Sequence, residues 1–199
     1  MSSEPDLSLF PAPSETASFE SEALPHLDAL YRTALRMTHN EQAAEDLVQD
    51  TLERAYSNFA RYEPGTNIRA WLFRILSNLA ISAYRRRASG PELSSIDEME
   101  DFSLYSQLGA GSSGASDVER GALDNLGQEA IRRAIDELPP DFRMVVLLAD
   151  VEGFSYKEIA EIVGIPKGTV MSRLFRGRRL LQRTLWDQAR AAGILTGAP

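Results

Sequence analysis

A stretch near the middle of the chain, residues 88–127, interrupts an otherwise helical pattern. It shows no repeating apolar spacing, and residues 109–114 have the glycine- and serine-rich composition of a flexible linker. Because the stretch has no amphipathic pattern, we expect it to be a linker and not a domain. The chain of 199 residues should therefore fold as two small domains, one on either side of it.

Three amphipathic helices are expected before this linker. Apolar side chains recur at three- and four-residue spacings over residues 24–38, 40–59 and 67–87. Asn40 is the expected N-cap of the second helix, and the turn-forming residues 63–66 precede the third. The residues expected to face inward from the third helix are Trp71, Leu72, Ile75, Leu79 and Ala83.

The block after the linker is expected to be helical as well. One helix should cover residues 128–138, stop at the proline pair 139–140 and resume over residues 141–150. Ser155 and Glu158 have the spacing of a capping box, which predicts that a further helix begins there.

The end of this block has the pattern of a helix-turn-helix. Gly164 supplies a left-handed turn, Pro166 cannot continue the preceding helix, and Thr169 is the expected cap of a last helix from about Val170 to Ala192. The side chains expected to point outward from this last helix, free to reach base edges and phosphates, are Ser172, Arg173, Arg176 and Arg179.

The whole pattern predicts an all-α fold, because no segment shows the alternation of a β-strand. We expect two small helical domains joined by a flexible acidic linker, the second containing the helix-turn-helix. The expected divisions are a disordered acidic N-terminus (1–23), a first helical domain (24–87), the linker (88–127), a second helical domain (128–192) and a disordered tail (193–199).

Charge is segregated along the chain more strongly than the net value of −8 suggests. Residues 88–130 carry nine acidic residues and one basic residue, whereas Arg69–Arg87 contains five arginines and Lys167–Arg183 six basic residues without any acid. Two acid-free basic runs in different blocks favour a polyanionic partner such as nucleic acid.

Several functional classes are disfavoured by the composition. The absence of cysteine excludes disulfides, cysteine metal sites and cysteine nucleophiles. The first twenty residues lack the features of a signal peptide, and no apolar stretch is long enough to span a bilayer, so we expect a cytoplasmic protein without membrane insertion. His26 and His39 are isolated and no phosphate-binding loop occurs, so we expect neither an enzyme nor a cofactor or metal site.

Three runs of residues carry a family resemblance. Asp46–Thr51, Gly65–Ile75 and Phe154–Arg179 resemble, in the same order, motifs of the extracytoplasmic-function sigma factors, the smallest class of the sigma-70 family. The resemblance implies an alternative sigma factor that binds core RNA polymerase and directs promoter-specific initiation, restrained by an anti-sigma factor. Residues 149–162 resemble the oxidative- and heat-stress branch, which is controlled by a zinc-binding anti-sigma protein.

For the first domain, the resemblance implies contacts to the beta-prime clamp helices of polymerase and to the melted minus-ten element. The residues it assigns to polymerase are Asp46, Leu47, Gln49, Asp50 and Glu53. Those it assigns to minus-ten DNA are Tyr62, Asn67, Arg69, Arg74 and Asn78, with Tyr62 and Asn78 lining a pocket for a flipped base. Trp71 is interpreted as a core residue in preference to a stacking platform.

For the second domain, the resemblance implies contacts to the beta flap of polymerase and to the duplex minus-thirty-five element. The residues it assigns to this DNA are Lys167, Thr169, Ser172, Arg173, Phe175, Arg176 and Arg179. Met171 stands where many relatives carry a basic residue. The acidic linker is implied to run towards the active-site and RNA-exit channels of polymerase.

Two other readings stay open. A stand-alone helix-turn-helix regulator would bind duplex DNA without polymerase and would not need the acidic surface around Asp46. A sigma-mimicking adaptor would occupy an anti-sigma protein without touching DNA. Neither alternative accounts for the basic last helix and the polymerase-docking motif in one chain.

Overall fold

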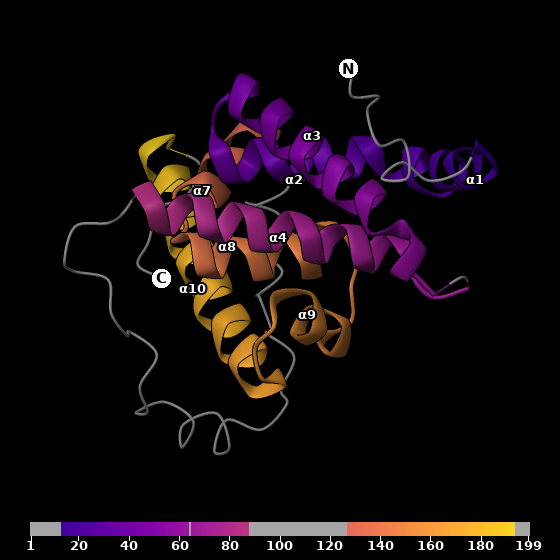
Figure 1. Ribbon diagram of the computed structural model, residues 1–199. Helices are drawn as coiled ribbons and strands as arrows, with labels where there is room; N and C mark the ends of the chain where they lie inside the picture. The colour runs from indigo at the N-terminus through magenta and orange to yellow at the C-terminus, as the bar shows by residue number, and fades with distance from the viewer. Residues whose placement is uncertain (1–12, 64, 88–126, 194–199) are drawn as a thin grey trace. The chain divides into compact units, whose positions relative to one another are not determined.

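The computed structural model describes residues 13–63, 65–87 and 127–193, and the regular structure within them is entirely helical (Figure 1). The all-α fold expected from the sequence is thus confirmed. The chain divides into two compact units, one made chiefly of residues 1–83 and the other chiefly of residues 84–160 and 164–199. Our expectations for residues 1–12, for the linker 88–126 and for the tail 194–199 lie outside the described residues.

The first unit is a set of α-helices with two short 3-10 turns. Its elements are α1 (Pro13–Ala23), η2 (Leu24–His26), α2 (Leu27–Thr38), α3 (Glu41–Ser57), η3 (Phe59–Arg61) and α4 (Ile68–Arg87). Helices α2 and α3 lie side by side (Figure 1). The core of this unit contains Leu30, Ala34, Ala44, Leu72, Phe73 and Leu76, none of which is exposed to solvent.

Helix α1 is a departure from the prediction that residues 1–23 are disordered. It covers Pro13–Ala23, and its side chains Phe19 and Ala23 are buried. These two positions are four residues apart and so lie on one face of the helix. The acidic composition around them concealed this short apolar face, because two residues are too few to establish a helical period.

The turn between α2 and α3 follows the predicted chemistry. The side chain of Asn40 accepts a hydrogen bond from the amide of Ala43 at 2.9 Å, which confirms it as the N-cap of α3. Before it, His39 ends α2 in the left-handed conformation with φ of 55°. A non-glycine residue in this conformation carries a steric cost.

The buried side of α4 differs from the prediction. Leu72 and Leu79 are buried as expected, but Trp71, Ile75 and Ala83 are only half-buried. The side chains buried in their place include Phe73, Leu76, Ser77 and Ala80. Apolar residues occur around much of this helix, so their spacing alone was compatible with either side.

The second unit contains α7 (Gln128–Asp136), α8 (Pro140–Val146), the π-helical turn η4 (Leu147–Val151), α9 (Tyr156–Val163) and α10 (Lys167–Ala191). The proline pair ends the first of these helices as predicted, and Pro140 begins α8. Buried residues of α8, Met144, Val145 and Val146, form part of its core.

Arg143 is a buried cation that closes the end of α7. Its Nε donates to the carbonyl of Ile135 at 3.2 Å, and its Nη2 donates to the carbonyls of Asp136 at 2.6 Å and Leu138 at 2.7 Å. Burial lowers the pKa of Arg143 from its usual value. The carbonyls at a helix C-terminus carry partial negative charge and so compensate for the lost hydration.

Helices α8 and α10 approach each other closely at Gly177. A Cβ atom at this position would lie 2.9 Å from Cγ2 of Val146 and 3.4 Å from Cβ of Phe142. Glycine is therefore required by the contact between the helices, since its backbone is ordinary helix. This role of Gly177 was not predicted from the sequence.

Candidate functional site

The helix-turn-helix is built from α9 and α10. The amide of Ser155 donates to Oε2 of Glu158 at 2.9 Å, and the amide of Glu158 donates to Oγ of Ser155 at 3.3 Å, which confirms the capping box. Gly164 ends α9 in the left-handed conformation with φ of 73°, and its amide donates to the carbonyl of Ala160 at 2.9 Å. The predicted turn is therefore present.

The start of α10 differs from the prediction. The helix begins at Lys167, with Pro166 as its N-cap, and not at Val170. The amide of Val170 already donates to the carbonyl of Pro166 at 3.1 Å, so Thr169 lies inside the first turn and does not cap it. Proline suits the cap position because the residue there needs no amide hydrogen for the helix.

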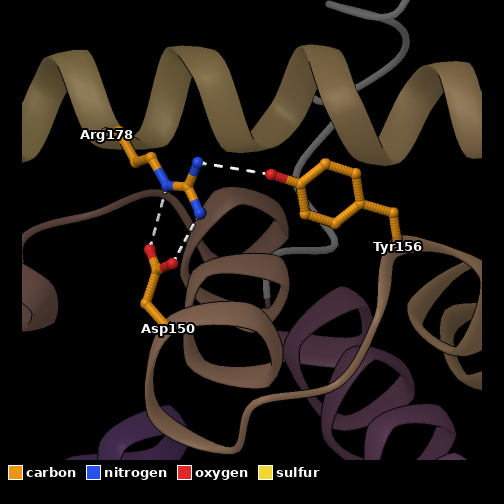
Figure 2. A network of polar contacts seen from close by, with 3 residues as sticks. All are labelled: Asp150, Tyr156 and Arg178. Atoms are coloured by element: carbon orange, nitrogen blue, oxygen red, sulfur yellow. Dashed lines mark hydrogen bonds and ion pairs between the residues drawn. The ribbon is translucent and has the colours of Figure 1, made fainter. Parts of the chain in front are cut away.

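A network of three side chains connects α10 to the preceding segments, as Figure 2 shows. Arg178 donates from Nη2 to Oδ1 of Asp150 at 2.6 Å and from Nε to Oδ2 at 3.1 Å. Its Nη1 donates to the hydroxyl oxygen of Tyr156 at 3.5 Å, at the start of α9. We call these three residues the Arg178 brace. The hydrogen bonds to Asp150 raise the pKa of Arg178 above its usual value.

The brace adds a directional contact to the buried stripe that packs α10 against its unit. Arg178 is tied to η4 by two parallel hydrogen bonds, a geometry that fixes direction as well as distance. Arg179, the next residue, is rotated by about 100° from this contact and is exposed. From the sequence, Arg178 was predicted only as part of the basic run, since nothing in the local sequence distinguishes it from Arg179.

The outer side of α10 carries an open groove of about 830 Å³. Phe175 is 40% exposed, and the guanidinium of Arg179 lies 5.8 Å from the centre of its ring. The groove is lined by Phe142 of α8 and by Phe175, Arg176, Arg179, Leu180, Gln182, Arg183, Trp186, Asp187 and Arg190 of α10. It is thus a surface of cationic and aromatic side chains.

The other residues assigned to minus-thirty-five DNA lie in the first two turns of α10. Lys167 is exposed, whereas Thr169 and Ser172 are half-buried. The hydroxyl of Ser172 donates to the carbonyl of Thr169 at 3.0 Å.

Arg173 was expected to be free on the outer side of α10, and this expectation is wrong. Only 8% of the residue is exposed, and its Nη2 lies 3.4 Å from Oδ2 of Asp141 in α8. Its position follows from the helical period, since Val170, Arg173, Leu174 and Gly177 form the buried stripe of this helix. That spacing is visible in the sequence, and it predicts the burial of Arg173 better than the charge of the side chain does.

In the first unit, α4 presents a polar outer face. Asn67 precedes the helix, and its Oδ1 accepts from the amide of Ala70 at 3.1 Å. Arg74 and Asn78 are exposed and lie one helical turn apart. Trp71 is half-buried and shares this side of the helix, three residues before Arg74. The prediction that it is simply a core residue therefore describes only part of its environment.

Arg69 is less accessible than the prediction required. It is half-buried, and its guanidinium lies 5.4 Å from the centre of the Phe73 ring. Partial burial, reinforced by the charge of Arg69, lowers the pKa of His26 below its usual value. This arginine therefore lies near His26 of η2 and over the ring of Phe73 in its own helix.

Tyr62 was expected to line a pocket for a flipped base, but it is only 7% exposed. Its ring stacks on that of Phe59, with centres 5.6 Å apart and an angle of 14°, and lies 5.2 Å from the ring of Trp71. Its hydroxyl donates to the carbonyl of Thr66 at 2.6 Å. Its ring therefore packs on both of these neighbours and offers little surface to a base.

The polar residues assigned to polymerase lie on one surface of α3. Asp46, Gln49, Asp50 and Glu53 are exposed. Gln49 donates to Glu53 at 2.8 Å, and Asp46 accepts from Gln42 at 3.1 Å. Leu47 is the exception, because it is 8% exposed and belongs to the buried side of α3. Its assignment as a docking residue is therefore not supported by its position.

A groove of about 460 Å³ runs between α2 and α3 beside these residues. Apolar side chains and carboxylates line it together: Leu27, Asp28, Tyr31, Glu45, Val48, Gln49, Leu52 and Glu53. Such a combination suits a partner helix with apolar and basic side chains.

Comparisons with known proteins agree with this arrangement. Residues 24–90 match sigma-70 region 2, and residues 128–181 match sigma-70 region 4. The chain is 36% identical over 171 residues to the ECF RNA polymerase sigma factor EcfG of Rhodopseudomonas palustris, covering 86% of this chain and 87% of that protein. It is 37% identical over 157 residues to the ECF RNA polymerase sigma factor SigE of Mycolicibacterium smegmatis, covering 79% of this chain but only 57% of that protein.

A solved structure shares the fold. The sigma factor RpoE from Bartonella quintana, in complex with the anti-sigma factor NepR, is 32% identical with a TM-score of 0.60, covering 84% of this chain and 96% of that chain. The chain therefore belongs to the sigma-70 family, within its extracytoplasmic-function class. The family expected from the sequence is confirmed, whereas the branch with a zinc-binding anti-sigma protein stays a prediction.

Over residues 13–63, 65–87 and 127–193, no group of three or more histidine, aspartate or glutamate side chains is placed to hold a metal ion. Within the same part of the chain, no helix combines the length and apolarity needed to cross a bilayer.

Proposed function

We propose that this protein binds core RNA polymerase and directs it to promoters through two DNA surfaces, one on α4 and one on α10. The observation that carries the proposal is the presence, in one chain, of both sigma domains, each with an outward-facing helix that carries basic and aromatic side chains. A regulator that binds DNA alone would need only the second of these domains.

The polymerase contact is proposed for α3 and the adjacent groove. Asp46, Asp50 and Glu53 would face basic side chains of the beta-prime clamp helices, while the apolar floor of the groove takes up an apolar side chain. Leu47 would support this surface from within. A second contact, between the second unit and the beta flap, belongs to the same proposal.

The minus-ten contact is proposed for the outer face of α4. Arg74 would bind the backbone of the melted strand, and the amide of Asn78 would read a base edge. Trp71 is the half-exposed ring on the same face, so it replaces Tyr62 as the candidate for stacking on an unpaired base. Asn67 and Arg69 would act mainly by shaping the start of α4.

The minus-thirty-five contact is proposed for the outer side of α10. Arg176 and Arg179 would reach guanine edges and phosphates, and Phe175 a thymine methyl group. Lys167, Thr169 and Ser172 would lie at the N-terminal end of the helix, which is the end that helix-turn-helix proteins direct towards base edges. Arg173 is excluded from this set because it is buried.

Restraint by an anti-sigma protein completes the proposal. The support is the solved relative, which was determined in complex with the anti-sigma factor NepR. An anti-sigma protein would hold the chain inactive by covering the surfaces on α3 and α10. Release would then permit transcription of stress-response genes.

The experiment that tests the function is in-vitro transcription with bacterial core polymerase on a randomised promoter library, with and without this protein. We expect specific transcripts only with both components, and we expect their upstream sequences to share two short elements at fixed spacing. If the protein binds duplex DNA tightly alone and adds nothing to polymerase, the proposal is wrong and the protein is a conventional regulator.

A further inference from the structure

Helix α1 lies outside the residues that match sigma-70 region 2, which begin at residue 24. Nevertheless, two of its side chains are integrated into the first unit. Phe19 is 7% exposed and Ala23 is fully buried. An element appended to the family's domain thus contributes to the core of that domain.

Phe19 begins a continuous row of aromatic rings. Its ring meets those of Tyr56 and Phe59 edge to face, with centres 5.4 Å and 5.2 Å away and angles of 67° and 76°. Phe59 stacks on Tyr62, and Tyr62 packs against Trp71 at 5.2 Å. We call Phe19, Phe59, Tyr62 and Trp71 the aromatic row.

The far end of the aromatic row reaches the proposed minus-ten surface. Trp71 is half-buried and packs against Tyr62, and its position on α4 lies on the same side of the helix as the exposed Arg74 and Asn78. An aromatic side chain that stacks on a base must be held in one orientation, because ordering it during binding would cost free energy. The row supplies that support.

Tyr62 also fixes the chain that leads into α4. Its hydroxyl donates to the carbonyl of Thr66 at 2.6 Å, and Asn67 then caps the helix through the amide of Ala70. A displacement of Tyr62 would therefore change both the packing of Trp71 and the start of the helix that bears it. Protein interiors are close-packed, so loss of the Phe19 ring is transmitted to the rings that contact it.

We propose that Phe19 of α1 is a positioning residue for the minus-ten surface, which holds Trp71 in its DNA-binding orientation through Phe59 and Tyr62. The inference rests on the proposed function of Trp71. It assigns a part in promoter melting to α1, a helix that lies before the residues matching region 2. Phe19 itself would not touch DNA.

The test is a double-mutant cycle on the full chain assembled with core polymerase. The probe is a fluorescent single-stranded DNA carrying the minus-ten element of a promoter selected in the transcription experiment, and the readout is its fluorescence anisotropy. The variants are Phe19→Ala, Trp71→Ala and the double variant, with Glu20→Ala on the exposed side of α1 as the matched control. Assembly with polymerase, measured separately, shows that each variant is folded.

We expect Trp71→Ala to weaken binding of the probe about tenfold and Phe19→Ala about fivefold, since stacking on one base is worth roughly 1 to 3 kcal/mol. In the double variant, loss of Phe19 should have no further effect, because its role passes through Trp71. Glu20→Ala should bind as the wild type does. Should Phe19→Ala fail to assemble, Phe19→Leu retains most of the volume, removes the ring and should show the same dependence on Trp71.

Two results would overturn the inference while leaving the proposed function intact. One is unchanged affinity in both Phe19 variants. The other is a loss from Phe19→Ala that persists in full in the Trp71→Ala background, which would indicate a general structural role. If the wild-type protein gives polymerase no affinity for the probe, the proposed function fails and the inference fails with it.

Discussion

Two neighbouring arginines on α10 have different tasks. The guanidinium of Arg178 is bound by Asp150 at 2.6 Å and 3.1 Å, whereas Arg179 is exposed and lies beside Phe175. Successive residues of a helix are rotated by about 100°, so two identical side chains face different surroundings. Together with the buried Arg173, this means that the basic run overstates the positive charge exposed on the outer side of α10.

The Arg178 brace gives a first prediction. Asp150→Asn removes the carboxylate charge and one of the two parallel acceptors. The free energy of unfolding of the second unit should therefore fall by about 1 kcal/mol. The expected loss is this small because both side chains are partly exposed to solvent. Affinity for duplex minus-thirty-five DNA should fall as well, because α10 loses one of the contacts that hold it against its unit. Urea unfolding and fluorescence anisotropy measure the two effects.

The matched control for the brace is Glu137→Gln, which changes an exposed carboxylate elsewhere in the same unit. It should leave both quantities as in the wild type. If Asp150→Asn unfolds at the wild-type urea concentration, the brace does not stabilise the fold.

The close approach at Gly177 gives a second prediction. Gly177→Ala should lower the free energy of unfolding by about 1 to 2 kcal/mol, since the overlap with Val146 exceeds the gain in helix propensity. In a Val146→Ala background, Gly177→Ala should lower the free energy of unfolding by less than it does in the wild type. The reason is that Val146→Ala removes the methyl group that the new Cβ would meet. Thermal unfolding of the four proteins measures this coupling, and strictly additive effects would contradict it.

At Arg173 and Leu47, the residue type was a poorer guide to exposure than the position on the helix. Arg173 and Leu47 were assigned to partners, yet the helical period already placed them with the buried residues of α10 and α3. Tyr62 is different, because it lies in an irregular segment, and its burial depends on Phe59 and Trp71. Only the tertiary structure could reveal that environment.

At the level of elements, the helix termini that are marked by a capping residue or a glycine were predicted correctly. Asn40, the Ser155–Glu158 capping box and Gly164 each act where the local sequence indicated. The start of α10 was missed because two possible caps, Pro166 and Thr169, lie close together and only backbone geometry separates them. Helix α1 was missed because its stability comes from contacts with Tyr56 and Phe59, distant in the sequence.

The left-handed end of α2 gives a prediction at this scale. His39→Gly should be more stable than His39→Ala by about 1 kcal/mol, since only glycine adopts a φ of 55° without steric cost. Comparing the two variants with each other cancels the interactions of the histidine side chain, which both of them lose. Equal melting temperatures would show that the turn relaxes when the side chain is removed.

At the level of the whole molecule, the protein combines a net charge of −8 with two local basic surfaces. An anionic chain is repelled by DNA beyond its own basic patches, so each surface alone should bind weakly and with strong dependence on salt. A polymerase that holds both units would let the two modest contacts act together through effective concentration. The charge distribution thus favours promoter binding by the complex over binding by the free chain.

The proposal that each unit binds a different promoter element gives a final prediction. Arg176→Ala should weaken duplex minus-thirty-five binding by the polymerase complex about tenfold and reduce transcription accordingly. Asn78→Ala should leave that duplex binding unchanged and reduce promoter melting, measured by permanganate reactivity of unpaired thymines. Wild-type activity of both variants would refute these site assignments, though not the fold.

Helix α10 combines positions that tolerate substitution with positions that do not. Val170, Leu174, Gly177 and Arg178 hold the helix against the rest of its unit, whereas Phe175 and Arg179 face outward. Under the proposed function, promoter preference could therefore be re-engineered by exchanging outward residues, with little effect on stability. An insertion or deletion of one residue would rotate all later positions by about 100° and lose both the anchoring and the reading side chains.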